Sequence, residues 1–87
     1  MAEDTLLEFP CDFPIKIMGP ATDEFRSLAL GIVTRHFGEL PGSRIEERPS
    51  SGGKYLSLTC IVRAESKAQL DAVYMELTAC RHVLVAL

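Results

Sequence analysis

Two spacings of hydrophobic residues alternate along the chain and predict both strands and helices. Apolar residues at every second position are typical of strands, and apolar residues at every third or fourth position are typical of helices. The polar stretch 43–48, in which Ile45 is the only apolar residue, fits an edge strand, because charged side chains on such a strand discourage edge-to-edge association. The predicted elements, in order, are a strand at 15–18, a helix at 22–36, a strand at 43–48, a strand at 54–64, a helix at 66–80 and a strand at 82–87.

Both predicted helices carry recognisable end signals. Thr22 is expected to cap the first helix, and Gly38 is well placed to end it. In the second helix Ser66 and Gln69 fit a capping box, in which each side chain is expected to bond the other's backbone N–H. These signals fix the two helices more firmly than hydrophobic spacing alone.

The N-terminal residues 1–13 are expected to form an irregular arm ahead of a single domain at 14–87. Pro10 and Pro14 disfavour regular helix there, and Gly19-Pro20 is expected to end the first strand. The arm is too apolar for a free tail, so part of it should pack on the domain. Its apolar residues are Leu6, Leu7, Phe9 and Phe13.

The order strand, helix, strand, strand, helix, strand favours an α+β fold. Right-handed crossovers lead to a ferredoxin-like βαββαβ sandwich, a four-stranded antiparallel sheet with both helices on one face. Alternation along the third strand then divides its side chains between the two faces. Leu56, Leu58, Cys60 and Val62 should face the helices. Tyr55, Ser57, Thr59, Ile61 and Arg63 should face water or a partner.

Charge and cysteine content narrow the class of protein. The chain of 87 residues has a formal net charge of −3, a handicap for binding nucleic acid. Its three cysteines are an odd number, whereas small secreted domains more often carry an even disulfide framework. We find neither a signal peptide at the acidic N-terminus nor an apolar run of membrane-spanning length. These features predict a cytoplasmic protein with reduced thiols and no membrane partner.

Several short segments follow one another from about Leu6 to Leu87. They are Leu7-Glu8-Phe9-Pro10, Lys16-Ile17-Met18-Gly19, Pro49-Ser50-Ser51-Gly52-Gly53-Lys54-Tyr55-Leu56-Ser57, Tyr74-Met75-Glu76-Leu77 and the C-terminal Val85-Ala86-Leu87. In their order and spacing they resemble the YbeD-like family of uncharacterised bacterial proteins. The resemblance implies a ferredoxin-like fold similar to ACT domains, which regulate amino-acid metabolism by binding small ligands. It also implies the family's provisional description as a proposed lipoate regulatory protein. No catalytic residues come with it.

Two segments are candidate ligand sites. Ser50, Ser51, Gly53 and Lys54 could cradle an anion with hydroxyls, backbone N–H groups and an ammonium. The alternative is a solvated hairpin connection, because the segment lacks the P-loop pattern. Met18 and Gly19 precede the first helix, where ACT-like domains often receive ligands. The alternative there is a glycine that merely turns the chain.

The uncovered sheet face is a candidate partner surface, with Tyr55, Thr59, Ile61 and Arg63 on its longest strand. Ferredoxin-like domains often pair through this face, so a homodimer is compatible with it. An RNA-recognition module would place several stacking aromatics there, and Tyr55 is the only one on this strand.

The sequence predicts no metal, no cofactor and no catalytic set. The cysteines and histidines lack ligand spacing, and no nucleophile motif is present. Glu46 and Glu47 should point to opposite faces of a strand. An acylphosphatase would need an arginine-bearing loop where this chain has Gly19-Pro20-Ala21-Thr22.

The expected function is a non-enzymatic regulatory or adaptor domain that acts through protein contact or a small ligand, with a link to lipoate metabolism. A nucleic-acid-binding module that uses the uncovered sheet face is the first alternative, and a small acylphosphatase-like hydrolase is the second.

Overall fold

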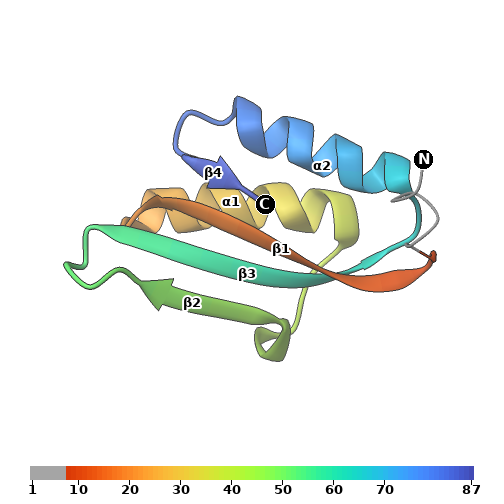
Figure 1. Ribbon diagram of the computed structural model, residues 1–87, viewed down its shortest axis with the longest axis horizontal. Coiled ribbons are helices and arrows are strands. Elements are labelled where there is room, and N and C mark those ends of the chain that lie inside the picture. The colour runs from red at the N-terminus through yellow and green to blue at the C-terminus, as the bar shows by residue number, and fades with distance from the viewer. Residues whose placement is uncertain (1–7) are drawn as a thin grey trace.

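The computed structural model describes residues 8–87 and has the expected order of elements. Figure 1 shows two helices and four strands joined by short connections. Their bounds are β1 (Cys11–Pro20), α1 (Asp23–Phe37), the 3-10 turn η2 (Gly42–Arg44), β2 (Ile45–Pro49), β3 (Tyr55–Ala64), α2 (Lys67–Ala79) and β4 (Val85–Ala86).

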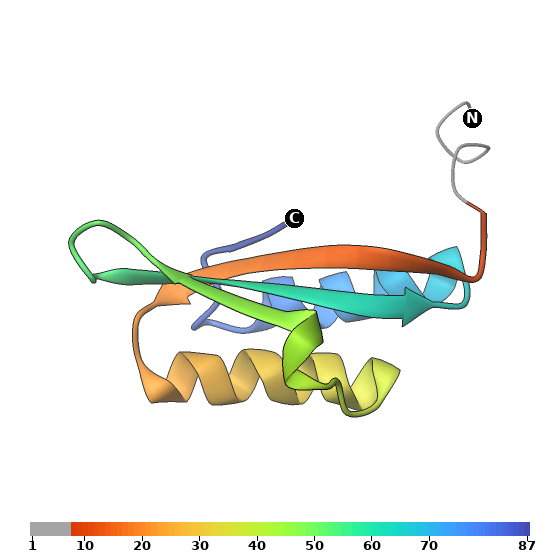
Figure 2. The ribbon, with the colours of Figure 1, turned by 90° about the horizontal axis from the view of Figure 1, so that it is seen from below.

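The four strands form one antiparallel sheet in the order β2-β3-β1-β4. Seen edge-on in Figure 2, the sheet carries both helices on one side, and no helix of the described residues covers its other side. This is the predicted α+β ferredoxin-like arrangement. A small domain of this kind has one core, which lies between the sheet and the helices.

Alternation along β3 places its side chains as predicted. Leu58, Cys60 and Val62 are fully buried, and Leu56 is nearly so. Buried residues from the helices close the core, with none of the buried side chains polar or charged among the described residues. From α1 these are Phe25, Ala29, Ile32 and Val33, and from α2 they are Leu70, Val73 and Leu77.

The first strand is longer than expected at both ends. It begins at Cys11, inside the stretch 1–13 that was expected to be irregular, and it runs through Gly19 and Pro20 instead of ending before them. Pro14 lies on the edge of β1 that faces β4. On this edge Lys16 N–H bonds the carbonyl of Leu87, the residue after β4, at 3.0 Å. Because β4 pairs only with residues 17 and 18, no strand lies beside Pro14 on this edge, and its missing N–H leaves no carbonyl without a donor.

Part of the N-terminal arm packs on the domain, as its apolar character predicts. Phe9 and Phe13 lie half-buried against the core. Leu6 and Leu7, which belong to the same expectation, lie outside the described residues.

The second and fourth strands are shorter than the apolar and polar stretches that predict them. The stretch 43–48 begins with η2, and β2 covers only Ile45–Pro49. The stretch 82–87 begins inside a turn in which Val83 N–H bonds the carbonyl of Cys80 at 3.0 Å. Only Val85–Ala86 forms a strand, because the turn after α2 takes up the first residues.

The helix ends match their sequence signals with one difference. Thr22 Oγ1 accepts a hydrogen bond from Phe25 N–H at 3.0 Å, and Gly38 ends α1 with a φ of 83°. Ser66 Oγ accepts from Gln69 N–H at 3.2 Å, as in a capping box. The Gln69 side chain, however, accepts from Glu65 N–H at 2.8 Å, and not from Ser66 as expected. Neither helix within residues 8–87 has the length and apolar character needed to cross a membrane.

Candidate functional site

The sheet surface that faces away from the helices, called the open face below, is not covered by any other element of residues 8–87 (Figure 2). Register fixes its members, because residues paired across antiparallel strands project to the same side. Lys16 pairs with Thr59, Met18 with Ser57, and Arg48 with Ser57 from the other neighbour. The open face thus comprises Asp12, Pro14, Lys16, Met18, Glu46, Arg48, Tyr55, Ser57, Thr59, Ile61, Arg63, Val85 and Leu87.

Exposed apolar side chains concentrate on this face. Of the eight large hydrophobic residues exposed within the described part of the chain, five lie here. They are Met18, Tyr55, Ile61, Val85 and Leu87. A cluster of this kind, mixed with charges, is typical of a surface that contacts another molecule.

A broad depression of about 480 Å³ lies in the middle of the open face. Its floor contains the half-buried Ser57 and Thr59 of β3. Charged and apolar side chains from the other strands stand around these two residues. They are Pro14, Lys16, Glu46, Arg48 and Leu87. The depression forms because small hydroxyl side chains on the central strand are flanked by longer ones on its neighbours.

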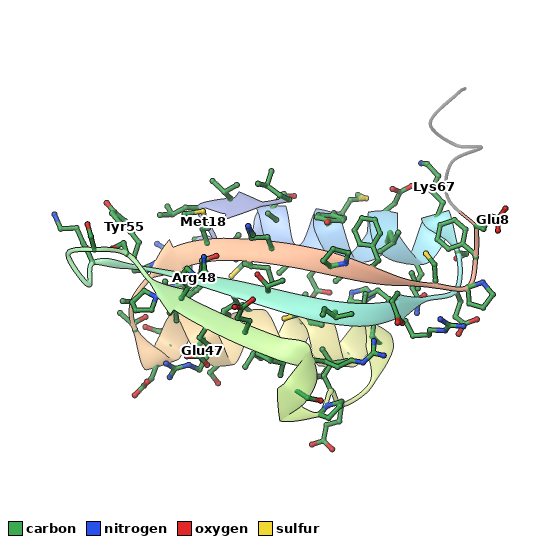
Figure 3. All side chains as sticks on the ribbon, turned by 60° about the horizontal axis from the view of Figure 1, so that its bottom comes forward. Glu8, Met18, Glu47, Arg48, Tyr55 and Lys67 are labelled. Atoms are coloured by element: carbon green, nitrogen blue, oxygen red, sulfur yellow. The ribbon has the colours of Figure 1, made fainter. Side chains whose placement is uncertain are left out.

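A second depression of about 160 Å³ adjoins the first at the β2–β3 hairpin. Figure 3 shows Met18, Tyr55 and Arg48 together at this end of the sheet. Its lining is mostly apolar and consists of Met18, Arg48, Pro49, Ser50, Tyr55, Leu56 and Ser57. The structure therefore brings together Met18 and Ser50, one residue from each of the two candidate ligand segments.

The remaining residues of the hairpin candidate do not line either depression. Ser51, Gly53 and Lys54 are exposed in the connection. Gly53 has a φ of 72°, which glycine adopts without strain, and its N–H bonds the carbonyl of Ser50 at 2.9 Å. Ser50 Oγ accepts from Tyr55 N–H at 3.1 Å. These internal hydrogen bonds occupy groups that an anion would need.

Gly19 is buried on the helix side, on the face opposite to Met18. A Cβ atom added there would lie 2.4 Å from two ring carbons of Phe25 and 2.6 Å from the carbonyl oxygen of His82. The glycine thus allows α1 and the turn before β4 to approach β1 closely. Packing accounts for Gly19, which neither turns the chain nor reaches a ligand from the open face.

The turn before α1 offers little to an anion. Ala21 N–H bonds the carbonyl of Lys54 at 3.1 Å, and Thr22 N–H bonds the carbonyl of Pro20 at 2.8 Å. Asp23 and Glu24 add negative charge in the first turn of the helix. An acylphosphatase-like phosphate cradle would need these N–H groups free.

The four residues of the expected partner surface all lie on the open face. Tyr55 lines the smaller depression and Thr59 lines the larger one. Ile61 is exposed farther along β3, toward its C-terminal end. Arg63 stands 3.6 Å from Asp12, which also takes a hydrogen bond from Arg44 at 3.1 Å. Arg44 and, to a lesser extent, Arg63 lower the pKa of the Asp12 carboxyl.

Sequence reasoning missed Lys16, Arg48 and Ser57 as members of a site. Alternation alone predicts that Lys16 points outward, but only the register across three strands shows that Lys16 and Arg48 stand on opposite sides of Ser57 and Thr59. Their proximity depends on pairings that a single chain pattern does not specify.

Glu46 and Glu47 point to opposite faces of β2, as predicted. Glu47 reaches to the helix side, where its carboxylate accepts two hydrogen bonds from Arg26 of α1 at 2.9 and 3.0 Å. Glu46 stays on the open face, 3.4 Å from Arg48. The two carboxylates therefore cannot act together on one group.

The helix side carries polar contacts that join its elements. His36 Nε2 lies 2.8 Å from Glu76 Oε1, and Arg35 also contacts Glu76, so two residues of α1 hold one residue of α2.

No serine or cysteine side chain within residues 8–87 bonds either His36 or His82. The groups of a nucleophilic catalyst are therefore not assembled in the described part of the chain.

The cysteines form no metal centre within residues 8–87, and one of them is buried in the core. Burial raises the pKa of the Cys60 thiol to about 11, which keeps it protonated and unreactive at neutral pH. All three cysteines are free. Across residues 8–87, no group of three or more His, Cys, Asp or Glu side chains is arranged to hold a metal ion.

Comparison with known proteins connects this fold to a family. The model of a family described as "Protein of unknown function (DUF493)" matches residues 4–87. The chain belongs to this family. A UPF0250 protein of Paraburkholderia phytofirmans is 50% identical over 84 residues, covering 97% of this chain and 94% of the relative.

Other relatives of the family are similar along most of their length. A UPF0250 protein of Ralstonia nicotianae is 50% identical over 84 residues, covering 97% of this chain and 87% of the relative. A UPF0250 protein of Nitrosomonas europaea is 46% identical over 77 residues, covering 88% of each chain. The resemblance to the uncharacterised YbeD-like bacterial family is thereby confirmed.

Proposed function

We propose that this DUF493 protein is a non-catalytic regulatory or adaptor domain that works through the open face of its sheet. The observation that carries the proposal is the gathering of exposed apolar side chains and a 480 Å³ depression on the same face. On the helix side, in contrast, polar side chains bond one another: Arg26 of α1 bonds Glu47 of β2, and His36 of α1 bonds Glu76 of α2.

A cytoplasmic regulatory domain of this kind needs a recognition surface and no reacting groups. The open face supplies apolar contact area, hydroxyls and charges, which together give affinity and orientation. The depressions are wide and shallow, which suits a protein segment or a ligand held against the sheet better than a substrate that must be shielded from water.

A link with lipoate metabolism is the more specific form of this proposal. The smaller depression is lined almost wholly by apolar surface, from residues that include Met18 and Tyr55, and Arg48 is also among its lining residues. This combination suits a short apolar chain that ends in a carboxylate, as in lipoate or octanoate. Calorimetric titration with octanoate and with lipoate tests this link. If neither ligand binds, and if no lipoate-pathway enzyme is found among captured partners, the link loses its support.

The general proposal is tested by matched variants on the two sides of the molecule. Ile61 and Met75 are both exposed apolar residues, one on the open face and one on α2. We expect Ile61→Glu to reduce capture of partners from a native lysate and Met75→Glu to leave capture unchanged, with both variants folded by circular dichroism. Loss of capture with Met75→Glu alone would refute the proposal, and so would robust substrate turnover abolished by a point mutation.

A further inference from the structure

Charge is distributed unevenly between the open face and the rest of the molecule. The chain as a whole has nine basic and twelve acidic residues. Among the described side chains on the open face and at its margin, however, basic groups outnumber acidic ones. The basic residues are Lys16, Arg44, Arg48 and Arg63, and the acidic residues are Asp12 and Glu46. An acidic protein therefore presents one locally basic surface.

Two of these cations are available to a ligand. Arg44 and Arg63 are both engaged with Asp12. Within residues 8–87, Arg48 forms an ion pair with Glu46 alone. The distance is 3.4 Å between side chains that are 77% and 66% exposed, and such a pair contributes little to stability. Lys16 has no ion-pair partner within residues 8–87. Lys16 and Arg48 both line the large depression.

The floor between these cations offers unused hydroxyls. Ser57 Oγ and Thr59 Oγ1 form no hydrogen bond with other described residues. Lys16 flanks Thr59 from β1 and Arg48 flanks Ser57 from β2, so hydroxyl donors lie between two cations. Such a group of donors is complementary to carboxylates, whose hydrogen bonds with cations are strengthened by charge.

The surroundings of the depression indicate the kind of molecule that carries those carboxylates. Exposed apolar residues border it, with Leu87 in its wall and Met18, Ile61 and Val85 on the same face. A nucleic acid would find only one aromatic residue on β3 for stacking. A second copy packed face to face would set the same excess of basic side chains against itself. An acidic polypeptide with apolar residues satisfies both the charge and the apolar border.

On the basis of the proposed function, we propose that the depression between Lys16 and Arg48 binds carboxylate side chains of an acidic protein segment whose apolar residues cover Met18, Val85 and Leu87. A segment that lies extended on the sheet presents every second side chain to it, so acidic residues can reach the depression together. The partner class is thus an acidic, partly apolar segment of another protein.

Selection from a displayed library of random 12-residue peptides tests this inference without knowledge of the partner. We expect the selected peptides to be enriched in Asp and Glu together with Leu, Ile, Val or Phe. Selection of neutral or basic peptides, or no enrichment at all, would overturn the proposed partner class.

The selected peptide is then titrated, by fluorescence anisotropy, into matched double variants. We expect at least a ~tenfold weaker Kd for Lys16→Glu/Arg48→Glu, with affinity falling as salt rises. The control Lys67→Glu/Arg81→Glu should change the Kd less than ~twofold. A folded Lys16→Gln/Arg48→Gln variant should show an intermediate loss. Equal effects of the two charge-reversal variants would overturn the proposal.

A third arm separates failure of the partner class from failure of the proposed function. A 12-nucleotide single-stranded RNA is titrated at 50 mM salt into the same proteins. RNA binding that only Lys16→Glu/Arg48→Glu abolishes, without peptide binding, would overturn the acidic-segment inference and leave the open face as the working surface. Binding of any probe that only Lys67→Glu/Arg81→Glu abolishes would overturn both.

Discussion

Substitution of Gly19 by alanine tests whether this residue serves packing, as its surroundings indicate. A carbon atom needs about 3.5–4.0 Å from its neighbours, and the new Cβ would meet Phe25 at 2.4 Å and the His82 carbonyl at 2.6 Å. Phe25 is fully buried, and the His82 contact is to backbone, so neither can move away easily. Overpacking of this kind costs about 1–3 kcal/mol.

The expected net effect is smaller than the clash alone. Replacing glycine by alanine also reduces the conformational entropy of the unfolded chain, which stabilises the folded protein by about 0.4–1 kcal/mol. We therefore expect Gly19→Ala to lower the free energy of unfolding by about 1–2 kcal/mol, which corresponds to a fall in Tm of about 4–16 °C for a domain of this size. Urea unfolding followed by far-UV circular dichroism measures the change.

Gly31 provides the matched control. It lies inside α1, and nothing stands within 4 Å of the position a Cβ would take. Gly31→Ala should raise the free energy of unfolding by about 0.5–1 kcal/mol, because alanine favours helix more than glycine does. If Gly19→Ala were as stable as the wild type, close packing would not explain Gly19, and its role as a ligand residue would have to be reconsidered.

Two further predictions concern titratable groups. In native protein at pH 8, iodoacetamide should modify the half-buried Cys11 and Cys80 before Cys60, whose pKa is raised to about 11 by burial; mass spectrometry that finds Cys60 modified first would contradict this. The pKa of Asp12 is lowered, chiefly by its hydrogen bond from Arg44, so its contribution to stability is present at neutral pH and is lost as the pH falls below about 4. Urea midpoints between pH 2 and 7 should therefore fall less steeply for Asp12→Asn than for the wild type, and identical slopes would show that the ion pair does not matter.

The sequence predicts the fold well where periodicity and end signals agree. Thr22, Gly38 and Ser66 mark helix ends that the structure confirms, and alternation along β3 correctly divides its two faces. Strand bounds are less predictable because they depend on partners elsewhere in the chain. The sequence predicts an irregular arm at 1–13, yet β1 begins at Cys11. Pro14 fits in this strand because β4 does not extend far enough to need a hydrogen-bond donor from it.

The candidate site is predicted less completely than the fold. Tyr55, Thr59, Ile61 and Arg63 follow from the alternation of one strand, and they lie on the open face as expected. The depression around Ser57 depends on how β1, β2 and the residue after β4 line up beside β3, and this register is set by the packed core. Local spacing could not bring Lys16 and Arg48 together.

The most direct test of the open face as the working surface uses two methionine methyl groups. Met18 lies on the open face and Met75 on α2, and both side chains are exposed. In protein labelled with 13C at the methionine methyls, addition of the selected acidic peptide or of captured partner should shift or broaden the Met18 signal and leave the Met75 signal unchanged. A Met75 signal that changes while the Met18 signal stays in place would contradict the assignment of function to this face.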